Sequence, residues 1–279
     1  MIMKHKAAFT ERDFFIVLAC IFFLLLNIAA IGSNGRERAK RMVCIANLNK
    51  LTHAWILYAD DNDGNLVNGE AVRVTGANTY HNNEPPWVGE DWGTNWQSGI
   101  NLSQDRQEDA IKSGALWPYC RNLRLYHCPS SHPGEFRNYS IVDSMNGRPR
   151  QGTYNGNVGQ KVGQTVLWLK KRSEIRMPGP AHRAVFIDEG WISPDSYAVH
   201  YQMASWWDDP PVRHSDGATL SFADAHAEHW RWKSQETINY GWDRERNWSG
   251  MYSPTTIESS RDLQRLQKAV WGRLGYAGY

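Results

Sequence analysis

The sequence lacks the short motifs by which many enzymes bind phosphate, activate a serine or hold catalytic zinc. It has no Gly-rich phosphate loop, no nucleophile elbow and no His-Glu-x-x-His string. It also lacks a positive field over most of its length. Residues 1–41 hold seven of the 31 Lys/Arg and three of the 29 Asp/Glu, so the remainder carries 24 − 26 = −2. Because nucleic-acid binding depends on neutralising phosphates, we expect no nucleic acid as a partner. Because the catalytic and phosphate-binding motifs are missing, we predict that the protein is not an enzyme and has no cofactor.

Long apolar runs are also scarce. The one present covers residues 14–31 and is interrupted only by Asn27. Its length approaches the ~20 residues that cross a bilayer, so it predicts a single-pass protein of the cytoplasmic (inner) membrane with its globular part in the periplasm or at the cell surface. A signal peptide cleaved near Gly32 and a lipoprotein signal at Cys20 are the alternatives.

Apolar residues continue beyond this run at helical spacing. They recur in steps of four and three at Cys44, Leu48, Leu51, Trp55 and Tyr58. This pattern predicts one long helix, 9–58, with a bend near Gly32 and Gly35 and one face packed under a sheet. The following Asp60 to Gly64 segment fits a helix end better than a calcium loop, since no Glu follows at the twelfth ligand position.

The remaining chain predicts short strands, turns and few helices. Residues 65–165 are rich in Gly, Asn, Pro and Trp, with one helix-like stretch at 107–119. Residues 183–190 read as a strand, and 218–222 with 227–232 as a hairpin. We expect an irregular segment at 240–254 and a final helix capped by Ser259. The predicted fold is α+β: a long N-terminal transmembrane and stalk helix packed on an antiparallel sheet with large loops.

Three tryptophans stand in a Gly-rich stretch after Pro85 and Pro86: Trp87, Trp92 and Trp96. Exposed, they would stack on sugar rings. Buried, they would anchor a loop-rich domain, since each aromatic side chain buries ~150–250 Å². We favour burial.

The N-terminal residues resemble those of a known family. Lys6, Phe9, Thr10 and Asp13, followed by the apolar helix, resemble the start of type IV pilin-like proteins and type II secretion pseudopilins. The family has Gly where this chain has Ala8, and Glu where it has Asp13. The resemblance implies that a prepilin peptidase removes a leader, 1–8, and methylates Phe9. The chain would then comprise this leader, the helix 9–58 and a globular part, 59–279.

Asp13 carries two interpretations. In the family, the acid at this position neutralises the N-terminal amine of a neighbouring subunit and sets the register of the filament. The simpler interpretation is that Asp13 stabilises the positive end of its own helix.

A second resemblance lies near the C-terminus. His214, nine residues, Asp224, Ala225 and His226 resemble the His-x9-Asp-Gly signature of large pilin-like proteins from planctomycete and verrucomicrobial bacteria, with Ala225 replacing Gly. A Gly at a hairpin tip supplies positive φ, and Ala there costs on the order of 1 kcal/mol. His214, Asp224 and His226 are weak metal candidates, with Asp188, Glu189 and His229 as possible neighbours. We favour a structural turn.

Four cysteines leave few pairings. The segments around Cys44 and Cys128 match the pilin-like group, whereas that around Cys120 does not, so the resemblance implies a Cys44–Cys128 disulfide. Zinc at Cys120 and Cys128, with histidines His127 and His132 nearby, is the alternative, although the spacing is not a standard ligand pattern.

Together these resemblances imply a membrane-anchored, pseudopilin-like structural subunit of a type II secretion or type IV pilus-type assembly. Its partners would be the prepilin peptidase, other pilin-like subunits bound through the N-terminal helix, and membrane lipid. A membrane-tethered polysaccharide-binding protein that does not polymerise is the alternative. A metal-dependent hydrolase centred on His214 and Asp224 is a third, less favoured interpretation.

Overall fold

A computed structural model describes most of the chain. The described residues are 10–71, 81, 84–90, 102–131, 133–148, 154, 156, 159–190, 195–246 and 251–278, with only the backbone described at 25–34 and 244–246. By internal contacts the chain divides into two units, Met1–Ala39 and Lys40–Tyr279. The second unit begins inside the first helix, whereas the sequence-based division placed the boundary after residue 58.

The first helix, α1, spans Glu11–Asp61. Thr10 and Asp13 cap its start: the Thr10 amide and hydroxyl donate to Asp13 Oδ2 at 3.0 and 2.6 Å, and the Asp13 amide donates to Thr10 Oγ1 at 3.3 Å. Gly64, with a φ of +77°, ends it by donating its amide to the Ala59 carbonyl. The segment after residue 60 is therefore a helix terminus, as predicted.

The predicted transmembrane helix is wrong, and so is the fold class to that extent. Among the helices in the described part of the chain, none is sufficiently long and apolar to cross a membrane. The predictions of a single-pass protein of the cytoplasmic (inner) membrane and of a helix that lies in lipid are wrong for the same reason.

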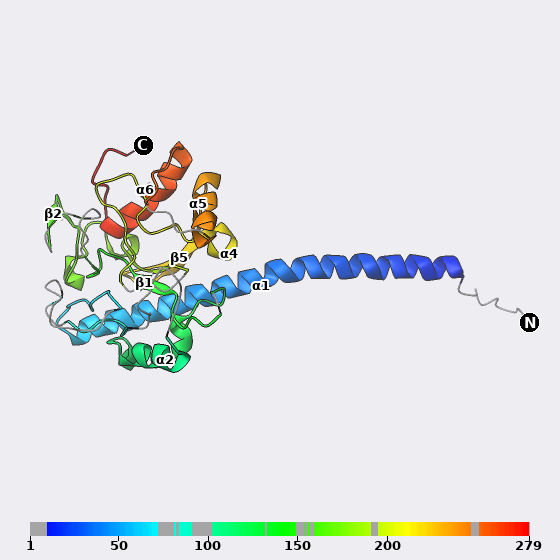
Figure 1. The fold of residues 1–279 in the computed structure, drawn as a ribbon, viewed down its shortest axis with the longest axis horizontal. Helices are drawn as coiled ribbons and strands as arrows, with labels where there is room; N and C mark the ends of the chain where they lie inside the picture. The colour runs from blue at the N-terminus through cyan, green and yellow to red at the C-terminus, as the bar shows by residue number, and fades with distance from the viewer. Residues whose placement is uncertain are drawn as a thin grey trace, which may run out of the picture. The chain divides into compact units, whose positions relative to one another are not determined.

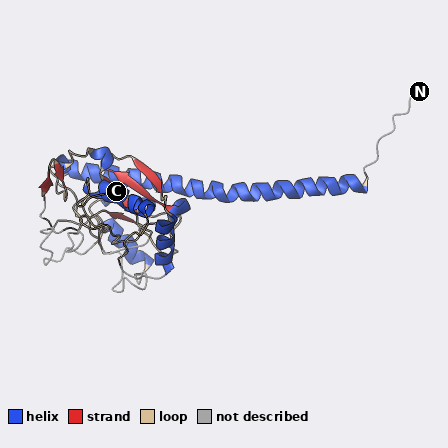
Figure 2. Cartoon of the chain, turned by 90° about the horizontal axis from the view of Figure 1, so that it is seen from above, coloured by secondary structure: helices blue, strands red, loops and turns tan. Residues whose placement is uncertain are grey.

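An antiparallel sheet forms the centre of the second unit, as predicted. Its order is β1 (Tyr139–Ile141), β4 (Ala184–Asp188), β5 (Gly217–Phe222) and β6 (Ala227–Arg231), all neighbours antiparallel. The last two form the expected hairpin. A separate pair, β2 (Lys161–Val162) and β3 (Thr165–Val166), lies outside this sheet. Figure 2 shows how much of this unit is loop rather than strand.

Short helices connect and cover the sheet. They are α2 (Gln104–Ser113), α3 (Trp117–Cys120), α4 (Arg213–Asp216), α5 (Gln235–Arg246) and α6 (Ile257–Trp271), with 3-10 turns at Leu123–Tyr126, Arg172–Glu174 and Pro180–His182. The predicted helix 107–119 breaks at Gly114, where a Cβ would lie 2.3 Å from the Trp87 carbonyl oxygen. The prediction of an irregular 240–254 is wrong for α5, and the cap of α6 is Thr256 rather than Ser259.

The core lies where the C-terminal part of α1 meets the sheet (Figure 1). Cys44, Leu48, Leu51 and Trp55 have no exposed surface, as their spacing predicted. Polar contacts fix the same face: Thr52 Oγ1 donates to Ser221 Oγ of β5 at 2.6 Å. On the other side α6 contributes Leu263, Leu266 and Val270 to the core. All residues of β1, β4 and β5 are thereby buried, whereas β6 keeps Glu228 and Arg231 exposed.

Candidate functional site

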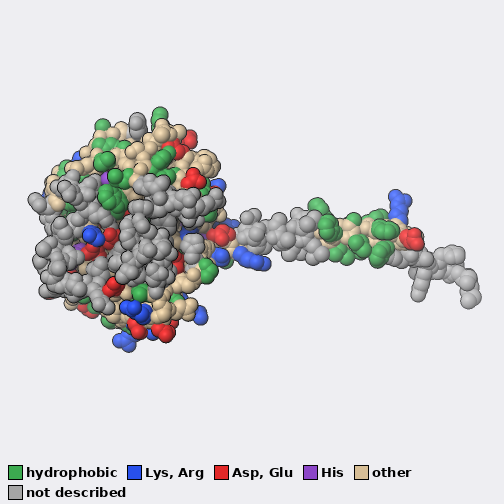
Figure 3. Space-filling model, viewed as in Figure 1, with side chains coloured by type: hydrophobic (Ala, Val, Ile, Leu, Met, Phe, Trp, Pro, Cys, Tyr) green, Lys and Arg blue, Asp and Glu red, His purple; other side chains and the backbone are tan. Residues whose placement is uncertain are grey.

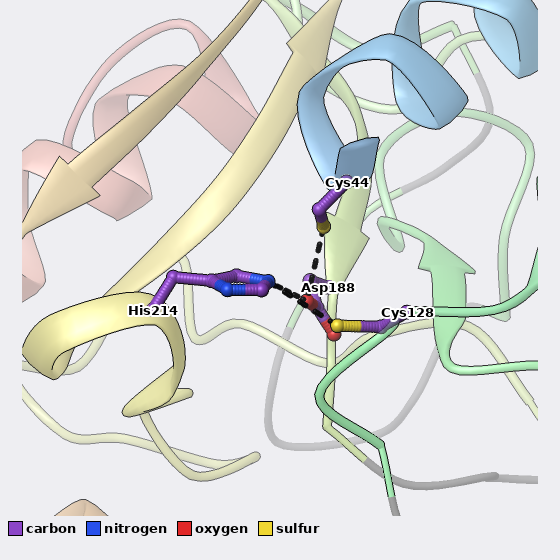
Figure 4. Close-up of side chains that lie close together, drawn as sticks. All are labelled: Cys44, Cys128, Asp188 and His214. Atoms are coloured by element: carbon purple, nitrogen blue, oxygen red, sulfur yellow. Dashed lines mark hydrogen bonds and ion pairs between the residues drawn. The ribbon is translucent and has the colours of Figure 1, made fainter. Parts of the chain in front are cut away.

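Four side chains with metal-binding atoms converge in the core of the second unit: Cys44, Cys128, Asp188 and His214. Figure 4 shows that they come from different elements: Cys44 from α1, Cys128 from the segment after the Leu123–Tyr126 turn, Asp188 from the end of β4 and His214 from α4. One ligand atom of each lies within 4.8 Å of the others. All four residues are buried, with His214 the most exposed at 3%.

Direct contacts link the four groups. The Cys44 thiol donates to Asp188 Oδ2 at 3.2 Å, and Cys128 Sγ lies 3.2 Å from His214 Nε2. His214 Nε2 also lies 3.6 Å from Asp188 Oδ2. The Tyr139 hydroxyl approaches from β1 and donates to Cys44 Sγ at 3.3 Å. Asp188 Oδ1, in contrast, is buried and has no hydrogen-bond partner among the described residues.

The cluster perturbs the pKa of each member. Burial raises the pKa of the Cys44 thiol well above its usual value, whereas a hydrogen bond with Cys44 lowers the pKa of Cys128. Burial opposes charge on Asp188 and His214, but the interaction between these two side chains, 3.6 Å apart, outweighs it. The pKa of Asp188 is lowered and that of His214 is raised to about 10.

His214 sits on strained backbone. It and the next two residues, Ser215 and Asp216, have φ values of 52°, 75° and 61°. Each L-residue in this left-handed region costs roughly 1–2 kcal/mol. Such conformations persist where surrounding interactions compensate for them, which is common at functional sites. The short turn α4 thus places the His214 side chain in the core. The contacts of His214 there must compensate for the backbone strain of the turn.

The geometry fits ligand binding better than nucleophilic catalysis. A catalytic cysteine needs substrate access, and a Cys-His-Asp relay needs the acid on the imidazole nitrogen opposite the thiol. Here Cys128 and Asp188 both contact Nε2 of His214, and all three side chains are buried. Two thiols, one imidazole and one carboxylate are, however, a ligand set suited to a borderline-soft cation.

The cysteines predicted from the sequence are brought together. Cys44 and Cys128 are both buried members of the cluster, but both are free thiols, so the structure does not contain the disulfide that the resemblance implies. Cys120 lies elsewhere and contacts the Tyr126 hydroxyl at 3.2 Å. His127 Nε2 lies 2.6 Å from Ser131 Oγ, and His127 is not a member of the cluster. His132 lies outside the described residues.

The residues of the predicted signature turn lie in two separate places in the structure. Asp224 and His226 are exposed at the β5–β6 tip, where their side chains pair at 2.6 Å and the Asp224 carboxylate also accepts from the His226 amide. Asp224 therefore accepts a hydrogen bond from a turn amide, which is the contact that the structural interpretation expects. Ala225 has a φ of +74°, so the tip keeps the conformation that Gly would supply. Only His214 of this signature belongs to the metal-capable cluster found among the described residues.

The structure describes some of the N-terminal and tryptophan residues singled out from the sequence but not others. Asp13 caps its own helix, and its pKa is lowered by the Thr10 hydrogen bonds. Ala8 and Phe9 lie outside the described residues. Trp87 is buried, stacking on Tyr126 with 5.9 Å between ring centroids, as expected of an anchor. Trp92 and Trp96 fall outside the described part of the chain.

The sequence pointed to the individual residues of the cluster but did not predict that they lie together. The cysteines were paired through one resemblance and His214 was singled out through another, with Asp188 only a possible neighbour. A usable signal was present: an Asp at the end of a fully apolar strand faces the core unless a turn intervenes. No protein-family model matches the chain, and comparison with curated proteins and solved structures gives no significant match either.

Proposed function

We propose that this chain is a pilin-like, pseudopilin-like structural subunit of a type II secretion or type IV pilus-type assembly, held to other subunits through its N-terminal helix. The observation that carries the proposal is the surface of α1 before residue 25. Nine large apolar side chains there are about half exposed or more, including Phe15 at 69% and Phe22 at 63% (Figure 3).

Such a surface requires cover. A helix that is apolar on all sides is normally buried in its working state, and large exposed apolar patches mark sites of association. Helices of neighbouring subunits would supply that cover. The contact would bury the apolar side chains, whereas the second unit has a core of its own.

The rest of the fold is compatible with this role. The same helix continues into the core of the second unit, where Leu48, Leu51 and Trp55 are fully buried against the sheet. A helix anchored so firmly at one end is suited to hold a domain in a repeating array. Asp13 would add register by meeting the N-terminal amine of the next subunit, beyond its present cap with Thr10.

The test is a crosslinking scan of the helix in the full chain. With Cys20 replaced by Ser, single cysteines are placed at Ile16, Val17 and Leu18, each about half exposed. A specific helix bundle gives high crosslinking yield at one position and low yield at its neighbours, because they face different sides of the helix. Non-specific aggregation gives equal yields, and a monomer gives none; either result overturns the proposal.

Matched variants sharpen this test. Phe15→Glu with Phe22→Glu should abolish the position-specific crosslink, whereas Met177→Glu, a change at a residue 52% exposed in the second unit, should not. Asp13→Asn keeps an acceptor for the cap but removes the charge, so it should shift the preferred position if the acid sets register. The proposal also places prepilin peptidase among the partners. A mature N-terminus at methylated Phe9 supports that step, and an intact Met1 contradicts it.

A further inference from the structure

We propose that Cys44, Cys128, Asp188 and His214 bind one Zn²⁺ ion in a closed, structural site. The inference does not depend on the assembly role, because all four residues belong to the second unit. Of the metal candidates suggested by sequence, the set keeps His214 and excludes Asp224 and His226. It also contains Asp188, which the sequence offered only as a possible neighbour, and Cys128, which the sequence placed with Cys120 in the alternative zinc site.

The distances between ligand atoms suit tetrahedral zinc. Bonds of about 2.0–2.3 Å place neighbouring ligand atoms about 3.3–3.8 Å apart at a tetrahedral centre. The three pairs formed by Cys44 with Asp188, Cys128 with His214, and His214 with Asp188 are 3.2, 3.2 and 3.6 Å apart. All remaining pairs lie within 4.8 Å, so side-chain rotations of small amplitude complete the coordination shell.

The ligand types favour zinc over harder cations. Two thiolates select borderline-soft metals, whereas calcium and magnesium prefer oxygen ligands throughout. Two thiolates and one carboxylate around Zn²⁺ leave a net charge of −1. Arg213, whose guanidinium donates to the carbonyls of Gly190 and Ser130, contributes a positive charge next to the ligand His214 in the chain.

Burial explains why a metal fits better than a disulfide. A Cys44–Cys128 disulfide would be neutral. It would therefore not stabilise the Asp188 carboxylate and the His214 imidazole, which both lie beside the sulfur atoms. Buried charges in proteins are paired or coordinate metals. A zinc ion satisfies both thiolates, the carboxylate and the imidazole at once, and it offsets the left-handed backbone that delivers His214.

The proposed ion would join distant parts of the chain. Its ligands come from α1, the segment after the Leu123–Tyr126 turn, β4 and α4 (Figure 4). With four protein ligands and no exposed face, the site has the form of a structural rather than a catalytic centre. Zinc would then contribute directly to the stability of the second unit.

The experiment measures zinc and free thiols in the full chain purified without chelator from zinc-supplemented cells. We expect about one zinc per chain by elemental analysis. Cys44→Ser and His214→Gln should weaken zinc binding by at least the roughly 10- to 100-fold that loss of an outer-shell partner causes. Cys120→Ser and His226→Gln are matched controls, since these residues lie outside the cluster, and should retain the metal.

A measurement on the unchanged chain guards against variants that fail to fold. Replacing zinc by Co²⁺ should give thiolate-to-cobalt charge-transfer absorption, which Cys120→Ser leaves intact. Substoichiometric zinc together with no such absorption overturns the proposal. So does a thiol count that shows Cys44 and Cys128 oxidised in the protein as purified, or equal zinc content in the wild type and in folded Cys44→Ser.

Discussion

At the scale of single residues, Ala225 combines a positive φ with a buried position at the β5–β6 tip. Its side chain is 2% exposed, and its carbonyl accepts from Asn49 Nδ2 of α1 at 2.6 Å. The contact with α1 holds the turn in place. The left-handed conformation is therefore imposed by the fold rather than chosen by the residue, and it costs an L-residue roughly 1–2 kcal/mol.

Ala225→Gly should stabilise the protein. Removing the Cβ relieves the left-handed strain, while the lost methyl burial and the greater freedom of Gly in the unfolded chain offset part of the gain. We expect a rise of about 0.5 kcal/mol in the free energy of unfolding, measured by urea titration.

The matched control is Ala223→Gly in the same turn. Ala223 has no positive φ and is 5% exposed, so Gly there should lower the free energy of unfolding by about 0.5–1 kcal/mol. Equal effects of the two substitutions would show that the turn conformation at residue 225 carries no strain.

The sequence singled out individual residues better than it grouped them. Cys44, Cys128 and His214 were all found, and the positive φ that the family glycine would supply is present at Ala225. Their grouping depends on the crossing of α1 over β4 and on the left-handed turn of α4. Three consecutive non-Gly residues with positive φ leave no trace in the local sequence, because Ser215 and Asp216 are ordinary turn residues.

At the scale of elements, α5 and α6 hold each other's N-terminal ends through two carboxylates. Asp262 of α6 accepts from the amides of Lys233 and Ser234, which precede α5. Glu236 of α5 accepts from the amides of Thr255 and Thr256 at 2.6 and 2.9 Å, just before α6. Each acid therefore stabilises the helix start of its partner element.

This arrangement predicts a pH-dependent contribution from Glu236. Burial raises the pKa of this carboxyl, but hydrogen bonds from Thr256, Tyr252 and Thr255 outweigh it and lower the pKa to about 2 from 4.5. A carboxyl with a depressed folded pKa stabilises the protein above its unfolded pKa. Glu236→Gln should therefore cost about 2 kcal/mol at pH 7, and the difference from wild type should shrink as the pH falls from 4.5 towards 2.

Denaturant unfolding at pH 7, 4.5 and 3 checks the prediction. Glu258→Gln provides the control, since Glu258 is an exposed acid in the first turn of α6 and should change stability little at any of these pH values. A difference between Glu236→Gln and wild type that stays constant with pH would rule out the carboxylate as its source.

The helices α5 and α6 show which elements could not be predicted correctly from the sequence. The periodic apolar pattern of α1 and the alternation in β5 and β6 are carried by their own residues, so these elements were predicted. α5 was not, because its residues are mostly polar and it includes Gly241. Its support comes from Asp262, 28 residues beyond Ser234. The expected Ser259 cap failed similarly, because Ser259 is buried against Thr237 and Thr256 takes its place.

At the scale of the whole molecule, the position of the boundary inside α1 decides which part of the helix the second unit requires. The sequence divided the chain into a helix, 9–58, and a globular part, 59–279, because the periodic apolar pattern ends there, although one face of the helix was expected to pack under a sheet. In the structure the compact unit begins at Lys40, and four apolar residues of α1 before residue 58 have no exposed surface: Cys44, Leu48, Leu51 and Trp55.

Two truncations therefore have opposite expected outcomes. A chain starting at Lys40 keeps the complete core, so its thermal midpoint should match that of the full chain. A chain starting at Ala59 loses all four buried side chains. Removing each large apolar side chain from a core costs about 2–5 kcal/mol, so the total exceeds the roughly 5–15 kcal/mol that stabilises a typical domain.

Circular dichroism distinguishes these outcomes. The chain from Lys40 should show a cooperative thermal transition and the near-ultraviolet signal of fixed aromatic side chains. The chain from Ala59 should show neither, because Trp55 and its neighbours fill the space beneath the sheet. Adding a peptide of residues 40–58 to the shorter chain should restore both signals if the helix acts as a core element. Cooperative unfolding of the shorter chain alone, at the midpoint of the full chain, would instead mean that the helix is dispensable for the core.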